Sequence, residues 1–315
     1  MEKTHKTKVL IIGSGPAGWT AAIYSARSAL SPIVVEGQQP GGQLTITSDV
    51  ENYPGFIEPI GGTELMQNMK KQAERFGTTI ISDIITEVDF SVRPFVCRGE
   101  SGAEYIADTV IIATGAQAKW LGLPSEAKYK GFGVSGCATC DGFFFRGKDV
   151  CVVGGGNTAL EDALYLTKFA NKVYLIHRRD QFNAEKIMQE RVFKNPKIEI
   201  IWNTVVEEVI GEDSLMLSVT GVKVKNTASG QTTELKADGM FVAIGYEPST
   251  KVFKGKLNMD EMGYILTEPN STKTNVKGVF AAGDVRDREY RQAVTAAGNG
   301  CMAALEAERF LANFV

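Results

Sequence analysis

The sequence predicts an α/β fold made of two three-layer units, each built around a parallel central sheet. One order of elements occurs twice: an apolar strand, a glycine-rich turn and a helical pattern. The first copy is KVLIIGSGPAG at 8–18, and the second is DVCVVGGGNTA at 149–159. Both copies continue to a second apolar strand, at 32–36 and at 172–176. A strand, a helix and a strand in this order form a βαβ unit with a right-handed crossover, which makes the strands parallel.

The glycines of each copy follow the pattern G-x-G-x-x-G/A, which opens at Gly13 in the first copy and at Gly154 in the second. The first glycine allows a tight turn, the second lets a pyrophosphate approach the backbone, and the third position allows close packing of helix on strand. The N-terminus of the helix then offers N–H donors to the phosphates. Both units are therefore predicted to be Rossmann-like dinucleotide-binding domains. Two ordinary glycine turns would not explain the second strand that follows each copy.

The residue that ends the second strand separates the two nucleotides. In the first copy it is Glu36, whose carboxylate suits the hydroxyls of an unphosphorylated ribose, as in FAD or NAD. In the second copy it is His177, followed by Arg178 and Arg179. Two guanidinium groups suit a 2′-phosphate, so the second site is predicted to prefer NADPH to NADH. A basic strand end that only faces solvent is the alternative.

Composition and charge exclude several classes of partner. The formal net charge of the 315 residues is −3, which disfavours nucleic acid and anionic membranes as partners. No apolar run approaches the ~20 residues that span a bilayer. The polar start, MEKTHKTK, lacks the apolar core of a signal peptide, so we expect a cytoplasmic protein.

Cys137 and Cys140 lie three residues apart in CATC, between the two glycine turns, and Asp141 follows them. This spacing lets the two sulfurs close a small reducible ring and carry two electrons by thiol–disulfide exchange. A zinc site would need two further ligands, and the sequence has no second CxxC and no HxxxH. We therefore predict a redox disulfide and no metal. The other cysteines, Cys97, Cys151 and Cys301, are interpreted as small core residues.

The second unit is expected to be inserted into the first. The buried strand TVIIATG at 109–115 suits the exit from one domain, and GMFVAIG at 239–245 suits the return. The first domain is then 1–117 together with 247–315, and the second is 118–246. The first domain is completed by a strand ending in an acid, VFAAGD at 279–284, and by a helix from 292 to about Phe314. Short β-like runs at 199–236 predict an added meander in the second domain.

In combination, the motifs resemble the low-molecular-weight thioredoxin reductases, which are FAD- and NADPH-dependent pyridine nucleotide-disulfide oxidoreductases of class II. The matching segments span nearly the whole chain: GSGPAG (13–18), GGQLT (41–45), ENYPG (51–55), ATG (113–115), CATCDG (137–142), GGGNTA (154–159), HRRD (177–180), AAGDV (281–285) and YRQAVTAAGNGCMAALEAE (290–308). The resemblance implies that the first domain binds FAD and that the inserted domain binds NADPH.

The resemblance also assigns cofactor contacts. It places Ser14, Gly15, Pro16 and Ala17 at the FAD pyrophosphate, Glu36 at its ribose, Gln43 and Asn52 beside the isoalloxazine, Asp284 near the ribityl chain, and Arg291, Gln292 and Ala293 at the pyrimidine end. It adds to that site the motif residues Gly13, Gly18, Gly42, Ala113, Thr114, Gly115 and Gly283. The NADPH site receives Gly154, Gly156, Asn157, Thr158, His177, Arg178 and Arg179.

The implied activity is thioredoxin-disulfide reduction, with electrons passing from NADPH through FAD to the Cys137–Cys140 pair and on to thioredoxin. Cys140 is implied to be nearer the flavin and Cys137 to attack the substrate disulfide, in a homodimeric enzyme whose NADPH domain rotates. Two alternatives share some of these features: a flavin-dependent dithiol oxidase and an NAD(P)H-binding redox sensor. The family commonly has a third arginine in HRR-x-x-F-R-A, where this chain has Asn183. We therefore expect a weaker preference for NADPH.

A proton donor for the dithiol is also needed. The chain has only two histidines: His5, at the polar start, and His177, assigned to NADPH. Asp141 is the available acid, and partial burial would raise its pKa. Capping of the next turn is the alternative role for Asp141. Phe143, Phe144 and Phe145 follow, and at least one of them is expected in the core.

Overall fold

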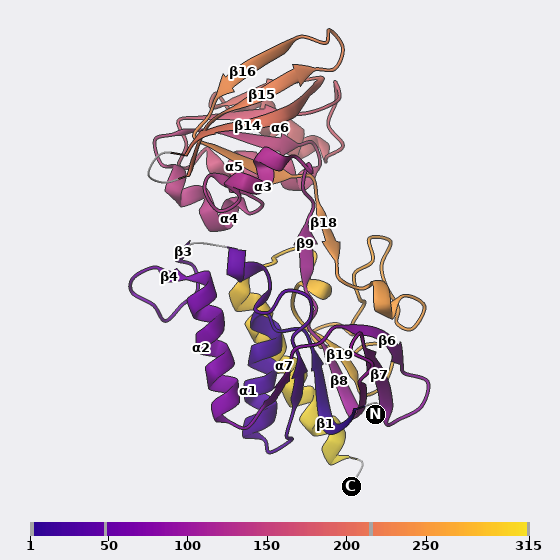
Figure 1. The fold of residues 1–315 in the computed structure, drawn as a ribbon. Coiled ribbons are helices and arrows are strands. Elements are labelled where there is room, and N and C mark those ends of the chain that lie inside the picture. Colours follow the sequence, from indigo (N-terminus) through magenta and orange to yellow (C-terminus); the bar gives the residue numbers. More distant parts are fainter. Residues whose placement is uncertain (1–2, 47–48, 214–216, 314–315) are drawn as a thin grey trace. The chain divides into compact units, whose positions relative to one another are not determined.

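The computed structural model describes residues 3–46, 49–213 and 217–313, and the chain divides into two compact units (Figure 1). The first unit contains Met1–Gln117 and Glu247–Val315, and the second contains Ala118–Tyr246. The chain passes between them through β9 (Ala116–Ala118) and β18 (Tyr246–Pro248), which pair as a two-stranded sheet. Each unit therefore has its own core, and each is described by itself below.

The sheet of the first unit has the order β5-β2-β1-β8-β7-β6, and β19 also pairs with β8. The strands β5, β2, β1, β8 and β19 are parallel, whereas β6 and β7 form an antiparallel extension. Their bounds are β1 (Thr4–Ile12), β2 (Ile33–Val35), β5 (Thr79–Ile81), β6 (Ile85–Asp89), β7 (Phe95–Gly99), β8 (Glu104–Ile112) and β19 (Val279–Ala281).

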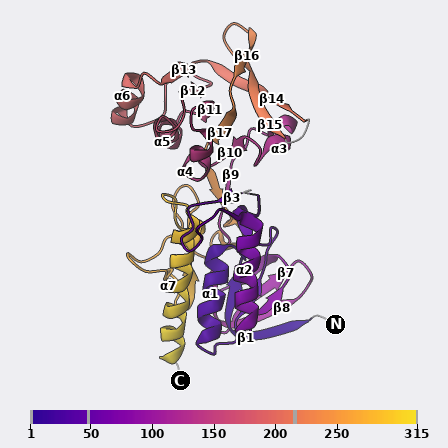
Figure 2. The same ribbon diagram turned by 90° about the vertical axis from the view of Figure 1, so that its left-hand side faces the viewer.

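Three helices lie side by side on one face of this sheet: α1 (Pro16–Arg27), α2 (Gly62–Arg75) and α7 (Ala293–Ala312) (Figure 2). Successive residues of a strand point to opposite faces. Val9 and Ile11 therefore pack with the helices, while Leu10 and Ile12 pack on the other face around Phe253. Short elements complete the unit: η1 (Gly42–Ile46), β3 (Asp49–Val50), β4 (Ile60–Gly61), η3 (Lys251–Phe253) and η4 (Gly283–Val285).

The polar start of the chain is part of the sheet, which differs from the sequence interpretation. β1 begins at Thr4, where its pairing with Glu104 of β8 starts, and the ring of His5 stacks on Tyr105 with the centroids 5.3 Å apart. Pairing with β8 supplies the backbone hydrogen bonds that an isolated polar segment lacks. At the other end, α7 ends at Ala312, and the expected helix end near Phe314 lies outside the described residues.

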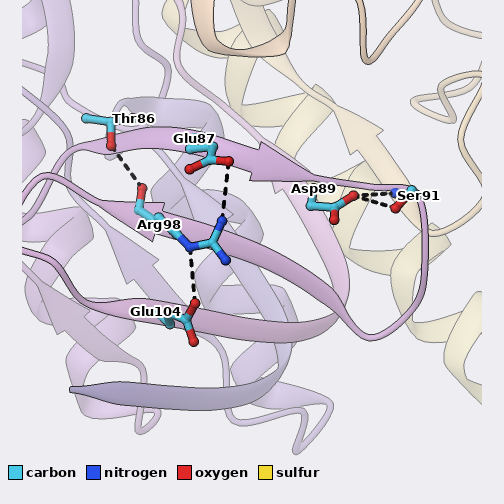
Figure 3. A network of polar contacts seen from close by, with 6 residues as sticks. All are labelled: Thr86, Glu87, Asp89, Ser91, Arg98 and Glu104. Carbon is cyan, nitrogen blue, oxygen red and sulfur yellow. Dashed lines mark hydrogen bonds and ion pairs between the residues drawn. The ribbon is translucent and has the colours of Figure 1, made fainter. Parts of the chain in front are cut away.

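Charged side chains line the outer surface of the antiparallel extension (Figure 3). Arg98 on β7 lies between Glu87 on β6 and Glu104 on β8, with N–O distances of 3.3 and 3.1 Å. Asp89, the last residue of β6, accepts hydrogen bonds from the backbone N–H and hydroxyl of Ser91 on the loop that follows. Exposed pairs of this kind contribute little individually, typically about 0–1 kcal/mol.

Asp83 anchors the segment between β5 and β6. Its carboxylate accepts hydrogen bonds from the hydroxyls of Ser101 (2.6 Å) and Tyr105 (2.7 Å) and from the backbone N–H groups of Ile84 and Ser101. Burial alone would raise the pKa of Asp83, but these four hydrogen bonds outweigh burial and lower it. The carboxylate is therefore stabilised in its ionised form.

We expect Asp83→Ala to lower the free energy of unfolding by about 3 kcal/mol, because two hydroxyls and two backbone donors lose their buried acceptor. The pKa of Asp83 is lower in the folded protein than in the unfolded chain. The stability that the ionised Asp83 contributes is therefore complete at pH values above its unfolded pKa, and it is lost as the pH falls through its folded pKa. Urea unfolding at pH 7 and at acidic pH measures both effects. Asp89→Ala, which removes an exposed acid, is the control, and equal losses for the two variants would contradict the assignment.

The second unit contains a parallel sheet of order β10-β17-β11-β12-β13 and a separate antiparallel sheet β14-β15-β16. The antiparallel sheet is the meander that the short β-like runs predict. The strands are β10 (Val134–Ser135), β11 (Asp149–Gly154), β12 (Lys172–Ile176), β13 (Ile198–Ile201), β14 (Thr204–Glu212), β15 (Ser218–Asn226), β16 (Thr232–Lys236) and β17 (Gly239–Ala243). The helices are α3 (Pro124–Tyr129), α4 (Ala138–Asp141), η2 (Gly142–Phe145), α5 (Asn157–Leu166) and α6 (Lys186–Lys194).

Within the part of the chain that the structure describes, none of the helices is long and apolar enough to cross a membrane.

Candidate functional site

The first glycine turn connects β1 to α1 and leaves no room for side chains on its inner side. Gly13 has φ +109°, and a Cβ there would lie 2.3 Å from the carbonyl oxygen of Ala113. A Cβ on Gly18 would lie 2.0 Å from the carbonyl oxygen of Gly13. At Gly15 a Cβ would meet nothing within 4 Å, so this side of the turn is open. The turn is therefore packed against the sheet and accessible at its middle glycine.

Helix α1 begins at Pro16, directly after the turn, and no side chain caps it. Its first N–H groups are thus left for another acceptor, as in helix-terminal phosphate sites. The side chain of Ser14 does not fill this role. Its hydroxyl donates to the carbonyl oxygen of Glu36 (2.7 Å) and accepts from the N–H of Gly41 (3.0 Å). Ser14 therefore joins the turn to the end of β2 and to the loop before η1.

Glu36 follows β2, and its side chain is only 7% exposed. Its Oε1 forms an ion pair with the Nζ of Lys70 on α2 at 2.7 Å, and Lys70 also lies over the ring of Trp19. Among the described residues, nothing donates a hydrogen bond to Oε2. The ion pair compensates the buried charge and leaves Oε2 as an acceptor without a donor among the described residues. Sequence reasoning missed Lys70, because a residue on α2 carries no local signal linking it to the end of β2.

Asp284 in η4 lies close to the first turn, since a Cβ on the adjacent Gly283 would be 2.9 Å from the Cβ of Ala17. The Oδ1 atom of Asp284 is buried and has no hydrogen-bond partner among the described residues. Burial, reinforced by the charge of Asp287 and opposed by Arg291, raises the pKa of Asp284 to about 7. A buried acceptor without a donor beside an uncapped helix suits a ligand that carries hydroxyl and phosphate groups.

Other predicted residues of the first unit lie in two further places. Asn52 donates a hydrogen bond from Nδ2 to the Oε1 of Gln292 (3.3 Å), which joins the loop after β3 to the start of α7. Thr114 donates to the carbonyl oxygen of Ser249 (2.9 Å), near the end of β18. The remaining predicted residues lie in three segments of the first unit. Gly42 and Gln43 are in η1, Gly115 precedes β9, and Arg291 and Ala293 are at the start of α7.

The second glycine turn connects β11 to α5, which is likewise without a side-chain cap. A Cβ on Gly154 would lie 2.3 Å from the carbonyl oxygen of Ala243, whereas one on Gly156 would meet only the carbonyl oxygen of Asn183, at 3.7 Å. The backbone of Asn183 bonds to the same turn, with its N–H donating to the carbonyl oxygen of Gly155 at 2.8 Å. The position that departs from the family pattern is therefore adjacent to the turn.

His177 packs beneath this turn. A Cβ on Gly155 would lie 2.2 Å from the imidazole, and the Nε2 atom of His177 is 3.0 Å from the carbonyl oxygen of Gln181. Burial lowers the pKa of His177. In contrast, Arg178 and Arg179 are exposed at the end of β12. The imidazole thus supports the glycine turn, and the two guanidinium groups are accessible to a ligand.

Asn157 and Thr158 occupy the first turn of α5. The Oδ1 atom of Asn157 accepts a hydrogen bond from the N–H of Glu185 at 2.8 Å. The segment before α6 is therefore held to the N-terminus of α5 by a side chain and to the glycine turn by the backbone of Asn183. Gly155 and Glu185 were not singled out from the sequence, because the fingerprint leaves its second position unspecified and Glu185 lies outside it.

The redox pair forms a disulfide between Cys137 and Cys140, whose Cα atoms are 5.3 Å apart. Both cysteines are partly buried, and Cys140 lies in α4. No group of histidine, cysteine or acidic residues among the described residues is arranged to hold a metal ion. Of the other cysteines, Cys97 and Cys151 are fully buried, as interpreted from the sequence, whereas Cys301 is only partly buried.

Asp141 ends α4, and its carboxyl is partly buried. Burial raises the pKa of Asp141, and a hydrogen bond from Ser135 opposes this shift. The side chain of Asp141 makes no capping hydrogen bond to η2, so the capping role considered from the sequence is absent here. An acid with a raised pKa next to Cys140 is suited to hold a proton for the dithiol.

Two hydroxyl groups that the sequence did not single out hold the backbone before Cys137. The Oγ atom of Ser135 accepts a hydrogen bond from the N–H of Cys137 at 3.0 Å. The hydroxyl of Tyr246 donates to the carbonyl oxygen of Gly136 at 2.5 Å. Tyr246 lies 110 residues further along the chain than Gly136, so only the fold brings it to the redox turn.

A family model described as pyridine nucleotide-disulphide oxidoreductase matches residues 7–300. The chain belongs to this family. A thioredoxin reductase of Rickettsia conorii is 60% identical over 305 residues, which cover 97% of this chain and 98% of the relative. A thioredoxin reductase of Coxiella burnetii is 54% identical over 318 residues, covering 99% and 98%. The structure of a thioredoxin reductase from Giardia duodenalis matches with a TM-score of 0.93 at 44% identity, covering 98% of this chain and 99% of that one.

As a pyridine nucleotide-disulphide oxidoreductase of this type, the protein uses FAD and NADPH. The donor sets of both units fit such ligands. Each unit has an uncapped helix after a glycine turn whose middle glycine is open. The first unit adds the carboxylate of Glu36 and the buried Oδ1 of Asp284, which has no hydrogen-bond partner among the described residues, and the second adds two exposed arginines.

Proposed function

We propose that this chain is a thioredoxin reductase that transfers two electrons from NADPH to the disulfide of oxidised thioredoxin. The balanced reaction converts NADPH, one proton and oxidised thioredoxin into NADP⁺ and the thioredoxin dithiol. One observation carries the proposal: a disulfide, Cys137–Cys140, lies in the same compact unit as a nucleotide-type glycine turn. The near-full-length similarity to proteins named thioredoxin reductase supports it.

We assign FAD to the first unit and NADPH to the second. Glu36, with one oxygen not engaged by Lys70, supports a ribose without a 2′-phosphate in the first unit. Asp284 supports a hydroxyl-bearing chain at the same site. Arg178 and Arg179 support a 2′-phosphate in the second unit. FAD and NADPH supply the electron pair and the hydride transfer, while the protein binds, orients and excludes water.

The residues of the redox turn then have distinct tasks. Two electrons break the Cys137–Cys140 bond, and Asp141 holds a proton that one of the two sulfurs takes up. We assign the attack on thioredoxin to Cys137 and the position nearer the flavin to Cys140, following the resemblance. The Cys137 thiolate attacks the thioredoxin disulfide, and the mixed disulfide is resolved by Cys140, which restores the internal disulfide.

Phe143 and Phe144 are the side chains we assign to contact with thioredoxin. They are 49% and 38% exposed, directly after the redox turn, whereas Phe145 is buried against Phe241. One phenylalanine of the three is thus in the core, as expected, and two present apolar surface beside the disulfide. Exposed aromatic side chains commonly form the central contacts of protein interfaces.

An anaerobic titration tests the function and separates it from its alternatives. NADPH is added until the flavin absorbance is bleached, and oxidised thioredoxin is then added without oxygen. We expect the flavin absorbance to recover. Recovery with oxygen but not with thioredoxin would instead identify a dithiol oxidase, and bleaching without recovery by either would indicate a redox sensor.

Replacing both arginines at the end of β12 is expected to weaken NADPH selectively. We expect Arg178→Ala combined with Arg179→Ala to raise KM for NADPH roughly 10- to 100-fold, because charge-assisted hydrogen bonds to the 2′-phosphate are lost. KM for NADH, which lacks this phosphate, changes little. Steady-state kinetics with both nucleotides measure the effect, with the exposed Arg191→Ala on α6 as control. An equal loss with NADH would refute the assignment.

Asn183→Arg should act in the opposite direction. Asn183 is exposed and its backbone lies beside Gly155, so a guanidinium there adds a third cation to the site. We expect the ratio of kcat/KM for NADPH over NADH to rise by about tenfold. Equal ratios for the natural protein and the variant would show that Asn183 does not weaken the preference.

We extend the proposal to a homodimer that acts in the cytoplasm, on the strength of the resemblance to low-molecular-weight thioredoxin reductases. Sedimentation equilibrium of the FAD-loaded protein tests the assembly. A mass of twice 34.2 kDa is expected, and a single-chain mass at micromolar concentration would rule the dimer out.

A further inference from the structure

Thr139, the third residue of CATC, brings a hydroxyl group to the redox disulfide. Its Oγ1 atom lies 3.4 Å from the Sγ atom of Cys137, which is a hydrogen-bond distance for sulfur. A sulfur in a disulfide has no hydrogen to donate, so the threonine hydroxyl is the donor in this pair. Thr139 therefore contacts one of the two atoms between which the S–S bond breaks and forms.

The backbone of the redox turn explains this contact. Cys137 is the N-cap of α4, with extended backbone angles (φ −142°, ψ 99°), and Thr139 is the second residue of that helix. Helical side chains lean toward the N-terminus of their helix, which directs the Thr139 hydroxyl back toward Cys137. The backbone of Cys137 is held by two hydrogen bonds, from its N–H to the Oγ atom of Ser135 (3.0 Å) and to its carbonyl oxygen from the N–H of Asp141 (3.2 Å).

The two sulfurs of the disulfide differ in their surroundings. Among the described residues, no hydrogen bond is donated to the Sγ atom of Cys140, whereas Cys137 has the Thr139 hydroxyl. A hydrogen bond to the charged form of a group favours that form, and it strengthens when the acceptor becomes an anion. Cys140 instead lies directly before Asp141, the acid of the redox turn. Negative charge is therefore favoured on Cys137 and the proton on Cys140.

The other ionisable groups around the redox turn do not supply this asymmetry. They come from α4 itself, from α5 and η2, which pack against it, and from the start of β18: Asp141, Glu161, Asp162, Tyr165, Arg146 and Tyr246. Five of these six are acids or phenols, whose negative forms disfavour a nearby thiolate. The sixth, Arg146, lies over the ring of Phe143, 5.1 Å from its centroid.

We propose that Thr139 is a catalytic residue whose hydroxyl stabilises the thiolate of Cys137 and makes this sulfur the nucleophile toward thioredoxin. The proposal rests on the proposed function, and it gives a structural reason for the task that the resemblance assigns to Cys137.

The electrons and protons of the cycle then have defined places. Two electrons break the S–S bond, Cys140 takes the proton of Asp141, and Cys137 keeps the negative charge beside the Thr139 hydroxyl. The Cys137 thiolate attacks one sulfur of the thioredoxin disulfide, and the other sulfur leaves as a thiolate that takes a proton from water. Cys140 then attacks Cys137, and its proton goes to the thioredoxin sulfur that is released. Asp141 regains its proton from water.

The test measures the ionisation of Cys137 by its rate of alkylation. The FAD-loaded enzyme is reduced without oxygen, freed of reductant and treated with iodoacetamide over a range of pH, and mass spectrometry of its peptides gives the rate at each cysteine. We expect Cys137 to react faster than Cys140. Thr139→Val keeps the shape of the side chain without the hydroxyl, and it should raise the midpoint of Cys137 alkylation by about 0.5–1 pH unit. Thr139→Ser keeps the hydroxyl and should restore the natural midpoint.

The pH dependence of the rate supplies a signature that a change in packing would not. A thiol that ionises more readily is also intrinsically less nucleophilic. Below both midpoints, Thr139→Val should therefore be alkylated at Cys137 about two- to fourfold more slowly than the natural enzyme, and above both midpoints at an equal or higher rate. The value of kcat/KM for thioredoxin should follow the same pattern. Thr232→Val, the same change at an exposed position of β16, is the control and should alter neither quantity.

Three results would overturn the proposal: an unmoved midpoint in Thr139→Val, a midpoint in Thr139→Ser as high as that in Thr139→Val, or faster alkylation of Cys140 than of Cys137 in the natural enzyme. If Thr139→Val does not retain FAD, Thr139→Ala, which also lacks the hydroxyl, is measured in the same way. Failure of the proposed function is distinct. A natural enzyme that did not reduce thioredoxin in the anaerobic titration would refute the function, whereas the alkylation midpoints report the Thr139 hydrogen bond without thioredoxin.

Discussion

Cys137→Ser is expected to abolish thioredoxin reduction, with kcat falling on the order of 10⁴-fold or more, as when a nucleophile acting within a catalytic unit is removed. The serine hydroxyl is not ionised at neutral pH and cannot form the mixed disulfide with thioredoxin. Cys140 remains, but without its partner it cannot close the internal disulfide that returns the enzyme to its oxidised state. The NADPH-linked thioredoxin assay measures the loss.

The same variant should retain the reactions that do not need the disulfide. NADPH should still bleach the flavin, and electrons should still reach a small artificial acceptor such as ferricyanide, because the residues of both nucleotide sites are unchanged. Cys301→Ser, which removes a partly buried thiol outside the redox turn, is the matched control and should leave thioredoxin reduction unchanged. Substantial thioredoxin turnover by Cys137→Ser would exclude the disulfide as the electron carrier.

The fold could be predicted largely from local sequence patterns. The repeated strand–turn–helix order fixes β1, α1, β11 and α5, because glycines at Gly13 and Gly154 mark where each strand must turn. The strand expected at 172–176 is β12, with the same bounds. Of the expected strand at 109–115, only residues 109–112 are in a strand, and they form the end of the longer β8, which begins at Glu104 and ends at Ile112. The polar first half of β8 was missed from the sequence. This half is held in the sheet by pairing with β1 and β7 and has no apolar pattern that would predict a strand.

The sites were predictable only where their residues lie within a motif. Cys137, Cys140 and Asp141 are adjacent in the sequence, so their chemistry could be inferred directly. Lys70 and Tyr246 could not be found, since each reaches its partner through the tertiary fold, one at Glu36 and the other at Gly136. A single sequence carries no signal for such pairs. These residues contribute by fixing the orientation of groups that the motifs already mark.

The two glycine turns also show that similar motifs are supported differently. In the first, the hydroxyl of Ser14 joins the turn to the residue after β2. In the second, the corresponding position is Gly155, and the imidazole of His177 occupies the space that a side chain there would need. The aligned residues Glu36 and His177 therefore differ in their surroundings: Glu36 is paired through Oε1 with Lys70, and His177 packs beneath the turn.

Asp141→Asn is the second large effect that we expect. General acid catalysis typically contributes a factor of about 10²–10⁴, and we expect kcat for thioredoxin reduction to fall roughly 10²-fold. Asparagine has nearly the same shape and can still accept a hydrogen bond from Ser135, but it has no acidic proton to give. Because the change is local to α4, flavin reduction by NADPH should continue at its normal rate.

The pH dependence distinguishes loss of an acid from loss of structure. Burial raises the pKa of Asp141, so the carboxyl keeps its proton to higher pH than an exposed aspartate does. Thioredoxin reduction by the natural enzyme should therefore decline as pH rises through this raised pKa, and that decline should be absent from the slow residual activity of Asp141→Asn. Asp149→Asn, which changes an acid at the start of β11, should keep the natural profile. If Asp141→Asn retained both the rate and the profile, the proton would have to come from solvent, and the raised pKa of Asp141 would have no role in turnover.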